Sequence, residues 1–281
     1  MRGNASTPIA MLKDALVYAA LTAVAFLMVF PFLWMASTSL KTLGEAFEYP
    51  PRFLPASPQW SNYSRLAEAI PMAKFLLNSV KITGLTVIGT LLSCSMAGFA
   101  LSALNFPGRG ALFTTTLATL MVPYQVTLIP VFILCQHLGW KDTHYPLWVP
   151  AFMGSAFGVF LLRQFFLAIP RDLYEAAMID GCTPGGIVFR IYIPLAKPAL
   201  TTLGVFTFMN SWNDLLNPLI YIDTLDKMPL TAGLSFLQSQ YSSDWPMMMA
   251  GAMVSILPIL AIFVFAQRTF VEGISTSGLK G

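Results

Sequence analysis

Six long apolar runs restrict what this chain can fold into more than any other feature of its sequence. They cover roughly residues 15–35, 76–104, 111–134, 145–166, 199–222 and 247–266. An α-helix of about 20 apolar residues is long enough to cross the hydrocarbon layer of a membrane, which is ~30 Å thick. Backbone polar groups inside lipid must bond within their own segment, so each run is expected to be a helix. The sequence therefore predicts an all-α, polytopic membrane protein, with six transmembrane helices in a single domain over residues 1–281.

The composition of the chain agrees with a lipid environment. Charged residues make up 10% of the chain and hydrophobic residues 56%, whereas about a quarter of the residues of a typical soluble domain are charged. The formal net charge is +3. Because the basic residues are scattered and form no face that could track a phosphate backbone, no nucleic-acid partner is expected.

The cysteines and histidines do not suggest a metal site or a disulfide framework. Cys94, Cys135 and Cys182 are far apart, odd in number, and lie in or beside apolar runs without any C-x-x-C pair. His137 and His144 are single imidazoles near a loop, where a polar surface position is the simpler interpretation. No metal is therefore expected, and without a nucleophile–base pair a membrane-embedded enzyme is disfavoured.

A charged, glycine-containing island separates the fourth and fifth apolar runs, with the sequence EAAMIDGCTPGGIVFRIYIPLAKP from Glu175 to Pro198. Asp172, just before it, lies near the expected start of a helix, where a carboxylate suits the positive end of the helix dipole. Gly181 is expected to end that helix as a left-handed cap. Thr183 can then cap a second short helix whose first residue is proline. The pattern predicts a helix, a sharp bend and a second helix.

One face of the first predicted helix carries small side chains. Leu173, Ala176, Ala177 and Asp180 follow the i, i+3, i+4, i+7 spacing of residues that share a helix face. The two alanines would let another surface approach closely. From these residues alone, an ordinary loop that caps two membrane helices is the alternative.

The island closely resembles the EAA motif of ABC importer permeases, E-A-A-x-x-D-G-A followed at fixed spacing by I-x-x-P. The matching residues are Glu175, Ala176, Ala177, Asp180, Gly181, Ile191 and Pro194. Cys182 replaces the usual alanine, which is a small-for-small change. The resemblance implies that residues 172–194, called the coupling segment below, form a cytoplasmic coupling helix that docks on a separate ATPase subunit. It assigns the coupling role to Glu175, Ala176, Ala177, Asp180, Gly181 and Pro194.

The resemblance also implies that Glu175 makes polar contacts in a cleft of the ATPase, while Gly181 fixes the bend. The chain contains no G-x-x-x-x-G-K-[ST] phosphate-binding loop, so it is not expected to bind ATP in that way. ATP and Mg would be bound by the partner ATPase, and the chain itself would be a permease subunit without catalytic residues or a cofactor of its own.

The C-terminal sequence QRTFVEGISTSGLKG, from Gln267, resembles the end of the second permease subunit in the carbohydrate-type (maltose-type) branch of the family. Ser275 and Ser277 depart from the usual Thr and Gly, so this match is looser than that of the island. The resemblance implies that the chain helps to import a sugar or oligosaccharide. Its partners would be a homologous second permease subunit, a dimeric ABC ATPase, an extracytoplasmic solute-binding protein and the surrounding lipid.

Polar residues interrupt the fifth apolar run. Asn210, Trp212, Asn213 and Asp214 form the candidate substrate path, with Trp212 offering a stacking face to a sugar and the others offering hydrogen bonds. Ionisable residues at membrane depth usually face a cavity or a partner. The alternative is structural, because such groups also bond neighbouring helices, and the residues alone favour it.

The charge distribution predicts the orientation of the chain. With both termini cytoplasmic, nine of the 16 Lys and Arg residues lie inside and seven outside, and four of those seven fall in the long segment after the first run. Long loops count little in the positive-inside rule. The first run is too long for a signal peptide. The sequence thus predicts a multi-pass protein of the cell (inner) membrane with cytoplasmic N- and C-termini.

The sequence is also compatible with two other kinds of transporter. An importer of glycerol-phosphate esters would share the architecture but would favour a cationic cavity, and Lys81 is the only cation well within a run. A secondary transporter driven by protons would use Asp214 as the proton carrier.

Overall fold

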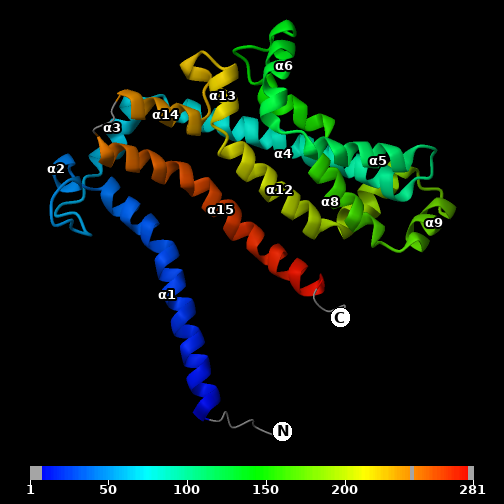
Figure 1. Cartoon of the computed structure of the whole chain (residues 1–281), viewed down its shortest axis with the longest axis horizontal. Helices are drawn as coiled ribbons and strands as arrows, with labels where there is room; N and C mark the ends of the chain where they lie inside the picture. The colour runs from blue at the N-terminus through cyan, green and yellow to red at the C-terminus, as the bar shows by residue number, and fades with distance from the viewer. Residues whose placement is uncertain (1–7, 241–243, 278–281) are drawn as a thin grey trace. The chain divides into compact units, whose positions relative to one another are not determined.

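The computed structural model describes residues 8–240 and 244–277, and this part of the chain is helical, without a β-strand (Figure 1). The α-helices are α1 (Pro8–Ser39), α2 (Leu43–Ala46), α3 (Ser61–Ala69), α4 (Met72–Ala103), α5 (Arg109–Ala118), α6 (Tyr124–His137), α7 (Tyr145–Trp148), α8 (Ala156–Leu167), α9 (Arg171–Ile179), α10 (Pro184–Ile187), α11 (Ile193–Leu195), α12 (Lys197–Trp212), α13 (Leu216–Tyr221), α14 (Leu230–Gln240) and α15 (Trp245–Ser277). Shorter elements are the 3-10 helices η1 (Thr119–Met121), η2 (Val149–Met153) and η4 (Leu225–Lys227), and the π-helix η3 (Val188–Tyr192). The all-α prediction is confirmed.

Contacts divide the described chain into two compact units. Unit 1 is drawn from Met1–Ala69 and Leu237–Val254, and unit 2 from Ile70–Phe236 and Ser255–Gly281. Unit 2 holds the coupling segment and the polar residues of the fifth apolar run. Helix α15 reaches Ser277, while residues 278–281 of the tail that resembles the maltose-type permeases lie outside the described residues.

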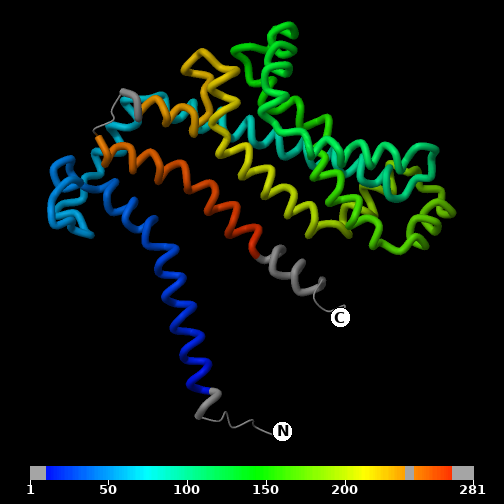
Figure 2. Tube along the Cα trace, viewed as in Figure 1, coloured from blue at the N-terminus to red at the C-terminus, as the bar shows by residue number. Residues whose placement is uncertain are grey.

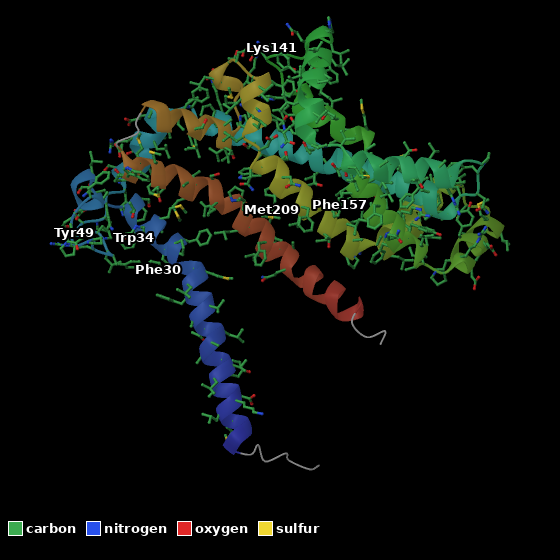
Figure 3. The ribbon with its side chains drawn as sticks, viewed as in Figure 1. Phe30, Trp34, Tyr49, Lys141, Phe157 and Met209 are labelled. Carbon is green, nitrogen blue, oxygen red and sulfur yellow. The ribbon has the colours of Figure 1, made fainter. Side chains whose placement is uncertain are left out.

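In unit 1, buried polar contacts hold the segment that follows α1. Lys41 is buried; its Nζ donates to the Arg52 carbonyl at 2.6 Å and lies 4.6 Å from the centre of the Trp34 ring, which Figure 3 labels. The Asn62 side-chain amide donates to the carbonyls of Ser39 and Lys41, each at 2.9 Å. A cation–π contact and a carbonyl acceptor together replace part of the hydration that a buried ammonium loses.

Six membrane crossings are compatible with the helices, but only four of them are unbent. Among the described residues, Met11–Ser39, Met72–Ala103, Tyr145–Leu167 and Trp245–Gln267 are long and apolar enough to cross a membrane. Two further pairs meet the same length and composition only together: Arg109–Met121 with Tyr124–His137, bent by 101°, and Pro184–Leu195 with Lys197–Trp212, bent by 84°. Counted as one span each, the pairs would give six, but the second pair includes Pro184–Leu195 of the coupling segment and ends ten residues before the end of the predicted fifth run, 199–222.

Three of the predicted continuous helices are interrupted. The third run breaks at Pro123, which precedes α6 in an extended conformation, because proline pushes the residue before it out of the helical region and lacks an N–H. The fourth run consists of α7, η2 and α8. Gly154 (φ 86°) ends η2, and the Ser155 hydroxyl caps α8 by accepting from the Gly158 N–H at 3.1 Å. Both breaks come from local proline and glycine chemistry.

The fifth run, predicted as one helix over 199–222, ends its first helix at Trp212. The next helix, α13, begins at Leu216. Pro218 lies within that second helix and cannot donate a backbone hydrogen bond, and the Asp214 carboxylate accepts from the Asn217 N–H at 3.2 Å, as a helix cap does. The polar residues of this run therefore surround a break rather than the middle of a helix.

Within unit 2, α4 packs along α8 and α12, as the traces in Figure 2 show. Glycines permit the close approach. A methyl group on Gly158 of α8 would come within 2.6 Å of the Cys94 sulfur of α4, and one on Gly98 would lie 3.1 Å from the backbone nitrogen of Arg163. Small residues at helix crossings are the usual means of tight packing in membranes.

Candidate functional site

The coupling segment starts with the predicted helix and ends it with the predicted cap. Helix α9 has Asp172 in its first turn. Gly181 takes φ 79°, the left-handed conformation. The Cys182 N–H donates to the Ala177 carbonyl at 2.9 Å and the Gly181 N–H to the Met178 carbonyl at 3.1 Å. This pair of bonds is a Schellman motif, which satisfies carbonyls at the helix end and reverses the chain.

The second half of the coupling segment is a short, irregular helix. The Thr183 hydroxyl accepts from the Gly186 N–H at 3.2 Å, and Pro184 is the first residue of α10. The helix continues through η3 and α11, which contains Pro194, and then turns by 84° at Ala196 into α12. The predicted sequence of helix, bend and helix is confirmed, with a π-helical stretch that was not predicted.

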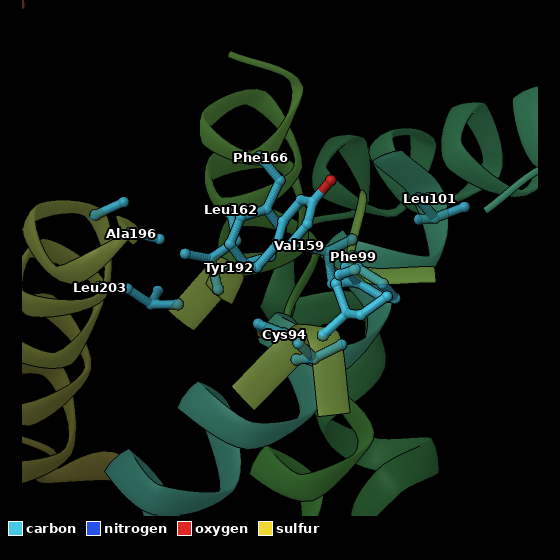
Figure 4. Close-up of a cluster of buried hydrophobic side chains, with 13 residues drawn as sticks. Cys94, Phe99, Leu101, Val159, Leu162, Phe166, Tyr192, Ala196 and Leu203 are labelled. Atoms are coloured by element: carbon cyan, nitrogen blue, oxygen red, sulfur yellow. The ribbon is translucent and has the colours of Figure 1, made fainter. Parts of the chain in front are cut away.

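A hydrophobic cluster joins the coupling segment to the membrane helices beneath it. Tyr192 is 3% exposed and meets two rings edge-on: Phe99 of α4, with centroids 4.9 Å apart, and Phe166 of α8, 5.4 Å apart. Figure 4 shows these rings together with side chains of α4, α8 and α12. Ile187 and Val188 of the segment are buried in the same cluster. The segment is therefore packed onto three helices rather than suspended as a loop.

Of the four residues predicted to share one face of the first helix, Leu173, Ala176 and Asp180 are exposed in the structure, whereas Ala177 is not. Ala177 is 6% exposed and belongs to the hydrophobic cluster, so its small side chain serves packing inside the chain. Asp172, Glu175, Ala176 and Ile179 are exposed and share the i, i+3, i+4, i+7 spacing, and Leu173 and Met178 are exposed as well. Ile179 is 87% exposed. Asp180, Gly181 and Pro194 are also exposed.

The four residues of the candidate substrate path are not brought together. Trp212 is 2% exposed: it stacks on Phe208, and its Nε1 donates to the Ser255 carbonyl at 3.1 Å. Its burial and these two contacts favour the structural alternative for this residue over the stacking role. The Asn213 amide donates to the Met209 carbonyl at 2.8 Å, beside the break after α12.

Asn210 and Asp214 do share a cavity, of about 810 Å³, in unit 2. Its polar lining comes from several elements: Thr86, Thr90, Tyr124, Ser155, Thr207, Asn210, Ser211, Asp214 and Asn217. Sequence reasoning missed the contributions from α4, α6 and α13. One signal was available, because residues 207, 210 and 214 repeat at the spacing of one helix face, whereas 212 and 213 point elsewhere.

A second polar cluster, also missed, joins the segment after α6 to the segment after α13. The Asp142 carboxylate accepts from the backbone N–H groups of Asp223 (3.0 Å) and Thr224 (2.8 Å) and from Lys227 Nζ (2.6 Å). His144 Nε2–H donates to the Lys227 carbonyl at 2.8 Å. The bonds from Lys227 and then Thr224 hold the pKa of Asp142 well below its usual range, and burial lowers the pKa of His144.

Comparison with known proteins assigns a family. The model of the family described as "Binding-protein-dependent transport system inner membrane component" matches residues 89–275. The chain is 34% identical over 254 residues to "Probable ABC transporter permease protein YurM" of Bacillus subtilis, covering 90% of this chain and 84% of that protein. It is 33% identical to "Lactose transport system permease protein LacG" of Rhizobium radiobacter, covering 93% and 95%. It is 38% identical to "Arabinooligosaccharides transport system permease protein AraQ" of B. subtilis, covering 74% of each.

The fold has a close counterpart among solved structures. A chain of a bacterial ABC transporter involved in the import of the acidic polysaccharide alginate superposes with a TM-score of 0.81, covering 94% of this chain and 98% of that one, at 23% identity. The family match covers the coupling segment and the lining of the polar cavity except Thr86. From the matched residues, the whole-length relatives and the helical fold, the chain belongs to the family of binding-protein-dependent transport system inner membrane components, the non-catalytic permease subunits of ABC transporters.

Proposed function

We propose that this chain is the second, maltose-type permease subunit of an ATP-driven importer for a sugar or oligosaccharide, and that its coupling segment docks on the ATPase. The observation that supports docking on the ATPase is the composition of the outward face of α9. Ile179 is 87% exposed and lies beside the exposed carboxylate of Glu175 on a helix that is packed onto the membrane helices. Leu173 and Met178 of the same helix are exposed as well, and several exposed apolar side chains rimmed by charge suit a protein interface.

The cytoplasm is the compartment in which such a partner would meet the segment. An even number of spans and the bias of Lys and Arg residues support cytoplasmic termini, and the segment between the fourth and fifth spans then lies on the same side. ATP and Mg would be held by the ATPase, since this chain has no phosphate-binding loop. A homologous permease and an extracytoplasmic solute-binding protein complete the assembly.

Movement would pass from the ATPase to the cavity through packed side chains. A displacement of α9 is carried by the cluster around Tyr192 into α4, α8 and α12. Residues from α4 and α12 also line the polar cavity. Alternating access needs an element with two arrangements that a partner can bias, and the coupling segment with its three helices is the unit that fits.

The sugar assignment rests on the relatives and on the chemistry of the cavity. Relatives named for lactose and arabinooligosaccharide transport cover most of this chain. The described residues that line the cavity include hydroxyl and amide groups and no Lys or Arg, which favours a sugar over a glycerol-phosphate ester. The relatives point to a sugar, and the cavity lining points to an uncharged one.

Co-purification and energised uptake test the proposal. The tagged chain should retain an ATPase, and Ile179→Asp or Glu175→Ala should release it while the detergent-solubilised chain stays monodisperse. Gly181→Pro should act likewise by removing the bend. Glu68→Gln, at an exposed position of α3, is the control for charge removal. Sugar uptake should continue after the proton gradient is collapsed and stop without ATP; the reverse would identify a secondary transporter.

A further inference from the structure

The polar cavity contains side chains that have hydrogen-bonding capacity to spare. Thr90, Thr207 and Asn210 all line it. In the described part of the chain, none of their side chains has a hydrogen-bond partner, in contrast to Thr86, whose hydroxyl donates to the Ile82 carbonyl at 2.8 Å. Polar groups at membrane depth that no protein group satisfies are costly unless water or a ligand does so.

Other groups of the cavity are held in place by one another. Tyr124 donates to the Asn217 side-chain oxygen, and the Asn217 amide donates to the Asp214 carboxylate at 2.8 Å. The Asn217 N–H donates to the other carboxylate oxygen at 3.2 Å. This chain of bonds fixes the carboxylate at the break between α12 and α13, so that its position does not depend on a solute.

The cavity also has an aromatic wall. Phe157 of α8, labelled in Figure 3, meets Phe206 of α12 edge to face, with ring centroids 6.4 Å apart, and both rings line the cavity. Ligand sites of about 300–1,000 Å³ that combine apolar walls with a few fixed polar groups are typical of small-molecule binding, and the cavity volume of about 810 Å³ falls in this range. A sugar presents both an apolar C–H face and hydroxyl groups to such walls.

The charge of the cavity decides between solutes. Asp214 is the only carboxylate among the described lining residues, and no Lys, Arg or His is among them. At an effective dielectric of about 20, a second negative charge within about 6 Å of a carboxylate is disfavoured by roughly 100-fold in affinity. An acidic sugar would meet this repulsion with no cation to offset it.

We propose that the cavity between α4, α8, α12 and α13 is a solute subsite of this subunit for uncharged, hydroxyl-rich molecules, and that Asp214 is the residue that excludes anions. This proposal rests on the proposed sugar-import function and adds the substrate class and the specificity-determining residue. Thr90, Thr207 and Asn210 supply the hydrogen bonds, and Phe157 and Phe206 supply the apolar contact.

Equilibrium dialysis of matched sugar pairs tests this. The complex of the chain with its co-purifying subunits, in nanodiscs and without binding protein, is titrated with radiolabelled lactitol and lactobionate, maltitol and maltobionate, and cellobiitol and cellobionate. Both members of a pair have the same linear end and differ by a carboxylate in place of a CH2OH group, so the first of each pair is the neutral sugar and the second is its acid. The wild type should bind at least one neutral sugar about 10- to 100-fold more tightly than its acid, and Asp214→Asn should reduce that ratio by about tenfold or more. Glu68→Gln, an exposed charge outside the cavity, should leave the ratio unchanged.

Two further variants keep the test decisive if Asp214→Asn fails to fold. Thr207→Val and Asn210→Ala should weaken neutral-sugar binding by about 3- to 10-fold, the effect of one hydrogen bond, without altering the neutral-to-acid ratio. An unchanged ratio in Asp214→Asn, or no binding of any pair by the wild type, overturns the subsite. Retention of the ATPase and ATP-dependent uptake are measured separately. Failure of the subsite proposal can therefore be distinguished from failure of the proposed importer function.

Discussion

Tyr192→Ala should detach the coupling segment from the helices that it is proposed to move. Tyr192 is 3% exposed and touches Phe99 and Phe166 edge-on at centroid distances of 4.9 and 5.4 Å. Truncation of a buried aromatic residue to alanine lowers the free energy of unfolding by about 3–5 kcal/mol. About 0.5–1.5 kcal/mol for each ring pair is included in that loss beyond the area buried.

Two matched variants separate the ring from other effects. Tyr192→Phe keeps both ring contacts, and the Tyr192 hydroxyl has no hydrogen bond in the described part of the chain, so its effect should stay below about 1 kcal/mol. Phe189→Ala removes a ring from the same π-helix, but Phe189 is 53% exposed and should cost far less. Equal losses for Tyr192→Ala and Phe189→Ala would refute the packing argument.

The assay combines stability with coupling. Unfolding of the purified chain in mild detergent, titrated with a denaturing detergent, gives the free-energy difference. In the reconstituted complex, Tyr192→Ala should retain the ATPase, because the outward face of α9 is untouched, yet lose stimulation of hydrolysis by solute and binding protein. Loss of the ATPase itself with normal stability would assign Tyr192 to the docking surface instead.

Two further predictions concern stability. Gly158→Ala should lower the free energy of unfolding by about 1–3 kcal/mol, since the added methyl group would lie 2.6 Å from the Cys94 sulfur. The control is Gly84→Ala, whose added methyl group would have nothing within 4 Å; it should leave the free energy of unfolding unchanged or raise it by up to about 1 kcal/mol. Similar thermal midpoints for the two variants would contradict the packing argument. The cluster around Asp142 should weaken on acidification. His144 and Asp142 both have pKa values in the folded state below those in the unfolded state, so the stability that each contributes is fully present above its unfolded pKa and is lost as the pH falls. The loss begins below about pH 6.5 for His144 and below about pH 4 for Asp142. Thermal midpoints from pH 7.5 to 3.5 should therefore fall, with the upper part of the decline flattened by His144→Gln and the lower part by Asp142→Asn.

Local chemistry explains what the sequence predicted well. The left-handed turn at Gly181 and the cap at Thr183 with Pro184 depend on residues within a few positions of one another, and the structure has both. Hydropathy located the membrane runs because lipid demands long apolar helices. The breaks at Pro123, Gly154 and Pro218 had sequence signals too, but the hydropathy of the whole run outweighed them.

Tertiary packing explains what was missed. Which face of α9 turns inward depends on Phe99 and Tyr192, which come from distant parts of the chain, so Ala177 was assigned to the outward face. Trp212 and Asp214 are neighbours in sequence, but one is buried against Phe208 and the other lines the cavity. The partners of Asp214 across the cavity lie far away along the chain and could not be paired with it by spacing.

Photocross-linking from Ile179 most directly tests the proposal that this segment transmits the work of a cytoplasmic ATPase. A photoreactive amino acid at position 179 should capture the nucleotide-binding subunit in intact cells. The same group at Tyr49, which is 94% exposed in the segment expected outside, should not. Capture of the ATPase from Tyr49 but not from Ile179 would contradict the proposed docking. Labelling of an Ile179→Cys variant, but not of the wild type, by a membrane-impermeant thiol reagent added outside the cell would contradict the proposed orientation.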